Sequence, residues 1–273
     1  MYALCVLVGA VLFLITFFTQ LKKLQVRIYF GAFILTFIAG IVLFIVGASL
    51  WDNTVHAIDG SREFGSAGIS FLGGAVLGLG AYALLLFLVY QDEMSVRIIF
   101  HALVPSLLIA HAFGRLGCFF GGCCYGKPSS WFWGVVYPED SVAAEMYGYG
   151  TKLIPTQLIE SVYLLGLYFV FLFVFKKRRV MYYCLCYGVY RFFAEYLRGD
   201  SRGAITSWLS PSQLLSIMLL IVAAVIFILG IRNKDDGTLA GPGYIIKSRL
   251  KLGGGIFVTK EEIEGTKKEE EEQ

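Results

Sequence analysis

The feature that most constrains this chain is a series of long apolar segments. Seven of them cover residues 1–18, 28–50, 71–90, 98–113, 153–175, 180–197 and 207–231. Most have roughly 17 to 25 residues, the length that an α-helix needs to cross a bilayer. Hydrophobic residues make up 57% of the chain, charged residues make up 16%, and the mean hydropathy is +0.70. This is far more apolar than a soluble domain. The sequence therefore predicts an all-α, polytopic integral membrane protein with about seven transmembrane helices.

The basic residues between these segments predict the orientation of the chain. If the loops alternate across the bilayer, one side receives Lys22, Lys23, Arg27, Arg97, Lys176, Lys177, Arg178, Arg179, Arg232 and Lys234. The positive-inside rule makes this the cytoplasmic side. Basic residues follow the first segment and none precede it, which is the reverse of a cleaved signal peptide. We expect a multi-pass protein of the cell membrane with its N-terminus outside and its C-terminus in the cytoplasm.

The chain is expected to divide into a seven-helix membrane domain, residues 1–232, and a cytoplasmic charged tail, residues 233–273. The tail ends in two lysines and four glutamates. The net charge of +3 is small, and acidic residues are concentrated in the tail, so no basic surface for nucleic acid is present. Polar or glycine-rich segments at residues 51–70, 114–152 and 198–203 fall on the outer side, where we expect the functional residues.

Ionisable residues inside predicted spans are costly in lipid and therefore mark candidate sites. Arg191, Glu195 and Arg198 are spaced by four and three residues, which places one carboxylate between two guanidinium groups on adjacent helical turns. A structural salt bridge would explain this triplet. Its net charge of +1 favours an anionic ligand instead, and phosphate is the anion that arginine binds best.

A second polar helix face carries His101, His111 and Arg115, which recur at helical spacing in the fourth predicted span. Arg115 and Arg198 both lie at the outward ends of their predicted helices. Neither is expected to have a carboxylate partner of its own. We therefore expect the two arginines to converge on one anionic head group.

Residues 114–126 form a segment with five glycines and three cysteines. Glycines end a helix and allow the backbone to approach a ligand. The spacing of Cys118, Cys123 and Cys124 is C-x4-C-C and lacks the paired C-x2-C units of zinc sites, so no metal is expected. A disulfide from Cys118 to Cys123 or Cys124 stays open, and so does a thiolate whose pKa the nearby arginines lower. Burial as small apolar side chains is expected for Cys5, Cys184 and Cys186.

Two further polar segments begin predicted spans, residues 155–160 with Gln157 and Glu160, and residues 210–216 with Gln213. Ser or Thr and Pro are typical of helix starts, where backbone donors can also face an anion. In the third span, Gly73, Gly74 and Gly78 predict close packing between helices more than ligand contact.

These residues together resemble the prolipoprotein diacylglyceryl transferases, which move a diacylglyceryl group from phosphatidylglycerol to the cysteine thiol of a lipoprotein precursor. The resemblance covers residues 1 to about 230. It rests on four motifs: Gly114-Arg115-Leu116-Gly117; Tyr187-Gly188 leading into Arg191, Glu195, Arg198 and Asp200; Pro155-Thr156-Gln157-Leu158 with Glu160; and Gln213 with Ser216. Tyr2 before Gly9, and the run Ser70-Phe71-Leu72-Gly73-Gly74, are further similarities.

The chain departs from the family pattern at several positions. The family signature continues Gly-Asn-Phe with Asn-Gly-Glu shortly after, where this chain has Cys118, Gly121, Gly122 and Cys123. The family has a histidine before the glycine pair of the third span, where Leu72 stands, and an arginine in the second span, where the residues around Gly40 are apolar. Two polar positions of the family thus carry thiols here.

The resemblance implies an enzyme, a transferase of the bacterial inner membrane with a role in lipoprotein biosynthesis. Its partners would be phosphatidylglycerol, a lipobox peptide of the lipoprotein precursor and membrane lipids, and no cofactor is expected. Its implied catalytic residues are Arg115 and Arg198 at the phosphate, with His101 or His111 as the base. Implied substrate-binding residues are Tyr2, Gly114, Gly117, Cys118, Cys123, Gln157, Glu160, Arg191, Glu195 and Gln213.

Two alternatives remain on the sequence alone. One is a related membrane transferase that uses the same phospholipid site with a different acceptor, since the arginines are retained while polar residues have become cysteines. The other is a non-catalytic lipid-binding or transport protein, since intramembrane charges also line such pathways.

Overall fold

The computed structural model describes residues 1–26, 28–58, 73–90, 92–200, 209–233, 237–241, 244–250 and 255–256. Leu72, named above for its departure from the family pattern, lies outside the described residues. The chain forms two compact units. Unit 1 contains Met1–Thr19 and Phe100–Thr238, and unit 2 contains Gln20–Ile99 and Leu239–Gln273.

Five of the described helices are long and apolar enough to cross a membrane. They are α1 (Tyr2–Lys23), α2 (Phe30–Ile58), α5 (Glu93–Phe120), α7 (Thr156–Phe173) and α9 (Pro211–Arg232). Two further predicted spans correspond to shorter elements. One is the π-helical turn η1 (Gly74–Gly78) continued by α4 (Leu79–Val89), and the other is α8 (Arg179–Ala194). The all-α membrane architecture is confirmed, while the number of seven spans stays a prediction.

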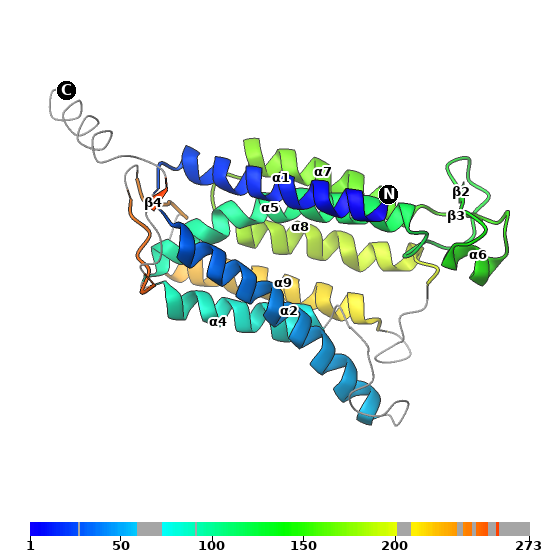
Figure 1. Cartoon of the computed structure of the whole chain (residues 1–273), viewed down its shortest axis with the longest axis horizontal. Coiled ribbons are helices and arrows are strands. Elements are labelled where there is room, and N and C mark those ends of the chain that lie inside the picture. The colour runs from blue at the N-terminus through cyan, green and yellow to red at the C-terminus, as the bar shows by residue number, and fades with distance from the viewer. Residues whose placement is uncertain are drawn as a thin grey trace. The chain divides into compact units, whose positions relative to one another are not determined.

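Unit 1 is a bundle of parallel and antiparallel helices, α1, α5, α7, α8 and α9 (Figure 1). The Ser161 hydroxyl of α7 donates to the carbonyl of Ala112 in α5 at 2.9 Å, and the Tyr163 hydroxyl donates to the carbonyl of Cys186 in α8 at 2.7 Å. A Cβ on Gly188 of α8 would lie 3.2 Å from a carbonyl of α9, so glycine permits close approach there. Side-chain hydroxyls and glycine therefore join helices that are otherwise apolar.

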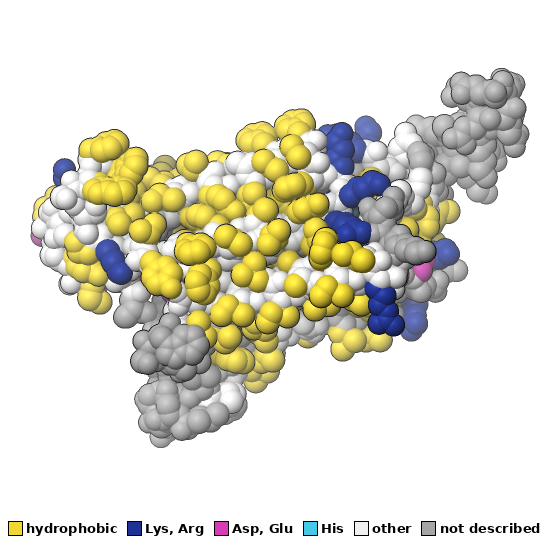
Figure 2. All heavy atoms as spheres, turned by 180° about the vertical axis from the view of Figure 1, so that it is seen from behind, with side chains coloured by type: hydrophobic (Ala, Val, Ile, Leu, Met, Phe, Trp, Pro, Cys, Tyr) yellow, Lys and Arg dark blue, Asp and Glu magenta, His cyan; other side chains and the backbone are white. Residues whose placement is uncertain are grey.

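The outer surface of these helices is hydrophobic. Val162 is 70% exposed and Ile228 is 61% exposed, and apolar side chains cover most of the surface seen in Figure 2. Such a surface would be unfavourable in water and is the normal exterior of a membrane protein, because lipid tails solvate it.

The connection between α5 and α7 forms a small packed cap at the end of unit 1 where α5 ends (Figure 1). It contains β2 (Val135–Val136), α6 (Val142–Tyr147) and β3 (Lys152–Leu153), and Val135 pairs with Leu153. Tyr125, Tyr137 and Leu153 are buried together. Burial raises the pKa of Tyr137 to about 12, so its hydroxyl stays a hydrogen-bond donor. This packed cap fixes the chain on both sides of the glycine-rich segment.

In unit 2, α2 packs against η1 and α4 through glycines. A Cβ on Gly78 would lie 2.5 Å from Cα of Phe44, and a Cβ on Gly74 would lie 2.7 Å from the Phe44 ring. Any larger residue would separate the helices. The prediction that Gly73, Gly74 and Gly78 serve helix packing is confirmed.

Short segments of the C-terminal tail pack onto the connections of unit 2. β4 (Gly255–Ile256) pairs with β1 (Ile28–Tyr29), and Tyr244 donates to Asp92 at 2.8 Å. Burial alone would raise the pKa of Asp92, but hydrogen bonds from Ser95 and Tyr244 lower it. The tail as a separate cytoplasmic domain stays a prediction.

Candidate functional site

The buried Glu160 of α7 is the centre of the first group of polar residues in unit 1. Arg115 Nη2 of α5 lies 2.5 Å from Glu160 Oε2, and the Tyr187 hydroxyl of α8 donates to Oε1 at 2.9 Å. His111 Nε2 lies 3.7 Å from Oε1. His111 and Arg115 are four residues apart, so both project from one face of α5 toward this carboxylate. Three helices therefore each contribute a polar side chain to one point.

The second group lies at the end of α8. Arg191 Nη2 is 2.9 Å from Glu195 Oε2 and also donates to Ser212 Oγ of α9 at 2.7 Å. Arg198 Nε lies 3.9 Å from the same Glu195 oxygen. Arg198 also binds both carboxylate oxygens of Asp200, at 2.9 and 2.5 Å. The predicted Arg–Glu–Arg triplet thus forms as the spacing indicated.

Glu160 of the first group and Arg191 and Arg198 of the second line a pocket between α7 and α8. The pocket is small and partly open to the outside, and Thr156, Ile159 and Tyr190 also belong to its polar and apolar lining.

The expectation that Arg115 and Arg198 lack carboxylate partners is wrong. Arg115 pairs with Glu160 and Arg198 pairs with Asp200. Spacing along one helix did not predict these pairs, because Glu160 comes from another helix and Asp200 follows the end of α8. Among the described residues of the two groups, three guanidinium groups face three carboxylates, so the net positive charge inferred for the triplet is cancelled.

Two buried polar atoms of the cluster have no hydrogen-bond partner among the described residues, the Nε of Arg115 and the Oε2 of Glu195, although that oxygen is in the ion pair with Arg191. A guanidinium has five N–H donors, and the Nε of Arg115 is buried without a hydrogen-bond partner among the described residues. A buried donor without a partner costs about 1–3 kcal/mol. An anionic ligand that reached Arg115 would supply the missing acceptor.

Two glycines hold Arg198 against the segment that follows the glycine-rich turn. α8 ends in the short helix η2 (Glu195–Leu197), and Arg198 then forms a β-bridge with Gly126. A Cβ on Gly126 would lie 2.7 Å from the carbonyl oxygen of Leu197, and Gly199 donates its N–H to the carbonyl of Tyr125 at 3.1 Å. This backbone contact requires glycine and fixes the position of the arginine.

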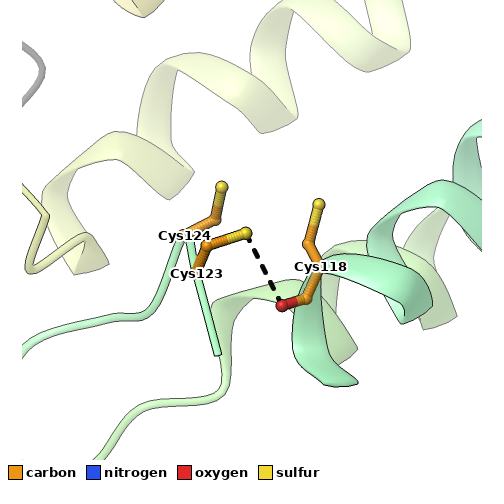
Figure 3. A group of neighbouring side chains, drawn as sticks. All are labelled: Cys118, Cys123 and Cys124. Carbon is orange, nitrogen blue, oxygen red and sulfur yellow. Dashed lines mark hydrogen bonds between the residues drawn. The ribbon is translucent and has the colours of Figure 1, made fainter. Parts of the chain in front are cut away.

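The three cysteines of the glycine-rich segment converge. Their sulfur atoms lie within 4.8 Å of one another, and Cys123 Sγ contacts the carbonyl of Cys118 at 3.7 Å (Figure 3). All six cysteines of the chain are thiols in the structure. Hydrogen bonds among the three neighbouring thiols, together with burial, raise the pKa of Cys123. This direction is opposite to the lowering of a thiol pKa by the arginines that the sequence predicted, because the neighbouring thiols and burial act most strongly on Cys123.

Gln157 and Thr156, at the start of α7, anchor this cysteine segment. Gln157 Nε2 donates to the carbonyl of Cys123 at 2.5 Å, and its Oε1 accepts from Tyr137 at 2.8 Å. The Thr156 hydroxyl donates to the carbonyl of Cys124 at 2.7 Å. Both groups of the Gln157 amide are engaged within the protein, so the structure places it as a support of the site.

The remaining predicted residues lie at different distances from the cluster. Gly117 is next to Tyr2 of α1, since its Cβ would lie 3.3 Å from the Tyr2 ring. A Cβ on Gly114 would meet no atom within 4 Å. Gln213 completes a capping box with Ser210 at the start of α9, each side chain accepting from the other's backbone N–H.

His101 lies far from the other candidate residues. It is fourteen residues before Arg115 on α5, which is about 21 Å along a helix. Its carbonyl accepts from Arg179 Nη1 at 3.0 Å. Of the two histidines proposed as a base, only His111 lies beside Glu160.

The structure adds three residues to the expected site, Asp200, Tyr187 and Ser212, of which Asp200 and Tyr187 belong to a motif that carries the family resemblance without an expected role. Tyr187 precedes Arg191 by one helical turn, and this spacing was a usable signal. Ser212 stands at the start of α9, and no pattern in the chain connects it with Arg191.

A family model described as prolipoprotein diacylglyceryl transferase matches residues 1–229. A phosphatidylglycerol--prolipoprotein diacylglyceryl transferase 2 of Clostridium perfringens is 34% identical over 210 residues, 72% of this chain and 77% of that protein. A phosphatidylglycerol--prolipoprotein diacylglyceryl transferase of Clostridium tetani is 34% identical over 70% of this chain and 77% of that protein. A protein of the same name from Dehalococcoides mccartyi is 26% identical over 74% of this chain and 79% of that protein.

Proposed function

Because the chain belongs to the prolipoprotein diacylglyceryl transferase family, we propose that it transfers the diacylglyceryl group of phosphatidylglycerol to the cysteine thiol of a lipoprotein precursor. The observation that carries the proposal is the buried cluster of Arg115, Glu160, Arg191, Glu195 and Arg198, formed by the motifs on which the resemblance rests. The chain is a membrane protein, so the site can meet a phospholipid substrate directly.

In this reaction a thiolate sulfur attacks the glyceryl carbon, a carbon–sulfur bond forms, and the carbon–oxygen bond to phosphate breaks. Its electron pair leaves on glycerol phosphate. The protein must therefore bind the phosphate and stabilise the negative charge that develops on the leaving oxygen. Arg115 supports this role with a buried donor that has no partner among the described residues, and Arg198 supports it with its place in the lining of the pocket.

Glu160, Glu195 and Asp200 act as positioning residues in this proposal. Each holds a guanidinium group in place through an ion pair, which removes the cost of ordering a long side chain when the phosphate arrives. Ser212 holds Arg191 from α9 in the same way.

His111 is the base that the proposal assigns to the acceptor thiol. It lies 3.7 Å from Glu160 and stacks edge-on against Tyr187, so it is held at the cluster. The thiol proton passes to His111 and then to the departing glycerol phosphate, which restores the histidine.

The orientation of the chain is part of the proposal. The Lys176–Arg179 connection would face the cytoplasm, and residues 114–152 would face outward, because translocating four consecutive basic residues is unfavourable. An alkaline-phosphatase reporter fused after Arg179 should be inactive, and one fused after Trp133 should be active. The opposite pattern would show that the chain is inverted.

The activity is tested by incubating the purified full-length protein with labelled phosphatidylglycerol and a lipobox peptide. We expect release of glycerol phosphate and a peptide mass increased by one diacylglyceryl group. A peptide with serine in place of cysteine is the matched control. Release of glycerol phosphate without peptide modification would indicate another acceptor. Lipid binding without any release would indicate a non-catalytic lipid-binding protein.

A further inference from the structure

Three thiols stand beside the proposed phosphate pocket without a role in the reaction described above. Cys118 lies in the last turn of α5, three residues after Arg115, and Cys123 and Cys124 follow in the turn after the helix (Figure 3). Their sulfur atoms lie within 4.8 Å of one another, and all three side chains are only partly buried. A ligand could therefore reach the cluster from outside.

The turn that carries these thiols is held in a strained conformation. Cys124 has a φ of +63°, a left-handed conformation that costs a residue with a side chain about 1–2 kcal/mol. Gly122, also at +63°, takes the same conformation without that cost. The carbonyls of Cys123 and Cys124 are fixed by Gln157 and Thr156. Strain that the surrounding structure maintains is a property of functional sites.

The three sulfur atoms fit a metal ion. Zinc binds thiolate sulfur at about 2.3 Å, so two sulfurs on a tetrahedral zinc are about 3.8 Å apart. The cluster, with a limit of 4.8 Å, reaches this geometry through shifts of about 1 Å. Soft thiolate ligands select zinc over magnesium or calcium, and three protein ligands with one open position are typical of catalytic zinc.

We propose that Cys118, Cys123 and Cys124 bind one zinc ion whose open fourth position takes the acceptor thiol, an inference that rests on the proposed function. The C-x4-C-C spacing argued against a metal because it lacks two paired units. In the structure this spacing is compatible with a three-sulfur metal site, because the end of a helix and a turn at Gly122 bring all three sulfur atoms together.

The position of the cluster suits the reaction. The Cys124 thiol is close enough to Arg115 and to Arg198 to interact with both electrostatically. A thiol that binds zinc loses its proton, which His111 takes in the proposed function. The zinc-bound sulfur then attacks the glyceryl carbon while the carbon–oxygen electron pair leaves on glycerol phosphate. The metal holds the nucleophile, and the arginines hold the leaving group.

The first test is the metal content of the full-length protein, purified in detergent under reducing conditions without chelator. We expect about one zinc per chain. Cys118→Ser, Cys123→Ser and Cys124→Ser should each lower zinc affinity about tenfold or more. Loss of a residue that only supports a metal ligand already costs about this much, and each of these changes removes a ligand itself. Cys184→Ser and Cys186→Ser are matched controls on α8 and should retain the metal.

The second test replaces zinc with cobalt in the unaltered protein, so that it does not depend on the folding of a variant. We expect absorption typical of tetrahedral thiolate coordination. A lipobox peptide should change this spectrum, and the peptide with serine in place of cysteine should leave it unchanged. An unchanged spectrum with both peptides would contradict acceptor binding at the metal.

Two outcomes separate this inference from the proposed function. Peptide modification by protein that takes up neither zinc nor cobalt would overturn the metal site and leave the function intact. Metal uptake with a peptide-dependent spectrum, but without cleavage of phosphatidylglycerol, would support the thiol-binding metal site and overturn the function. A Cys118–Cys123 disulfide in protein that stays metal-free after reduction would also overturn the metal site.

Discussion

Arg115 and Arg179 are both buried arginines of unit 1, and they are satisfied in different ways. Arg179, which is 5% exposed, donates from Nε to the carbonyl of Phe175 and from Nη1 to the carbonyl of His101, each at 3.0 Å. Arg115 pairs with the carboxylate of Glu160 and keeps a buried Nε without a partner among the described residues. The first arginine completes backbone hydrogen bonds, and the second has capacity left for a ligand.

The comparison teaches that a buried charge does not by itself mark a site. The Phe175 carbonyl follows the end of α7, and the His101 carbonyl lacks its helical donor because Pro105, four residues on in α5, has no N–H; an arginine beside them therefore completes the backbone hydrogen bonds. A pair of buried ions is a costly alternative to apolar packing, and its retention in a membrane helix points to function. A structural arginine is therefore distinguished by backbone carbonyl partners, and a candidate site arginine by a carboxylate partner and an N–H donor that remains without an acceptor among the described residues.

The largest effect is expected from Arg115→Lys. Lysine keeps the ion pair with Glu160 but loses the planar donors, so release of glycerol phosphate should fall roughly 10²- to 10³-fold. Arg179→Lys is the matched control and should change the rate less than about threefold. The rate is measured with labelled phosphatidylglycerol after size-exclusion chromatography has shown that both variants are folded. Equal losses in both would remove the distinction between the two arginines.

The next largest effect is expected at the histidines. Removing a general base typically slows a reaction by about 10² or more, so His111→Gln should reduce turnover by roughly that factor. His101→Gln should leave it nearly unchanged, because His101 lies about 21 Å from Arg115 along α5. Turnover of both variants is measured across a range of pH. A dependence on His101 alone would move the base to the other end of the bundle.

A smaller effect is expected from Arg198→Lys. Lysine retains the charge beside Glu195 but cannot form the bidentate contact with Asp200. The cationic group at position 198 is then no longer held in place, so turnover should fall about tenfold. The double variant Arg198→Lys with Asp200→Asn should be no worse, since Asp200 acts through the arginine. A further tenfold loss in the double variant would show that Asp200 has a role of its own.

The smallest effect on turnover is expected from Arg179→Met, which should act on stability. The change leaves the carbonyls of Phe175 and His101 without the arginine donor, at a cost of about 1–3 kcal/mol in the free energy of unfolding. Thermal unfolding in detergent measures this loss, and the rate at a permissive temperature should stay within about twofold. A large catalytic loss at full stability would mark this region as a second functional site.

The sequence by itself determined the membrane architecture, the family and most of the polar cluster. Span length and apolar composition follow from local chain chemistry, because a helix in lipid must satisfy its backbone internally. The Arg191, Glu195 and Arg198 triplet was equally readable, since these side chains share adjacent turns of one helix and the turn that follows it.

Only the tertiary structure decided which residues from separate segments meet. The pairing of Arg115 with Glu160 joins α5 to α7, and the pairing of Arg198 with Asp200 depends on a turn that Gly126 holds. The two carboxylates balance the net positive charge that the Arg191, Glu195 and Arg198 spacing predicted. The same packing places His111, and not His101, beside Glu160. The convergence of Cys118, Cys123 and Cys124 likewise depends on two left-handed residues, a backbone geometry that spacing along the chain does not encode.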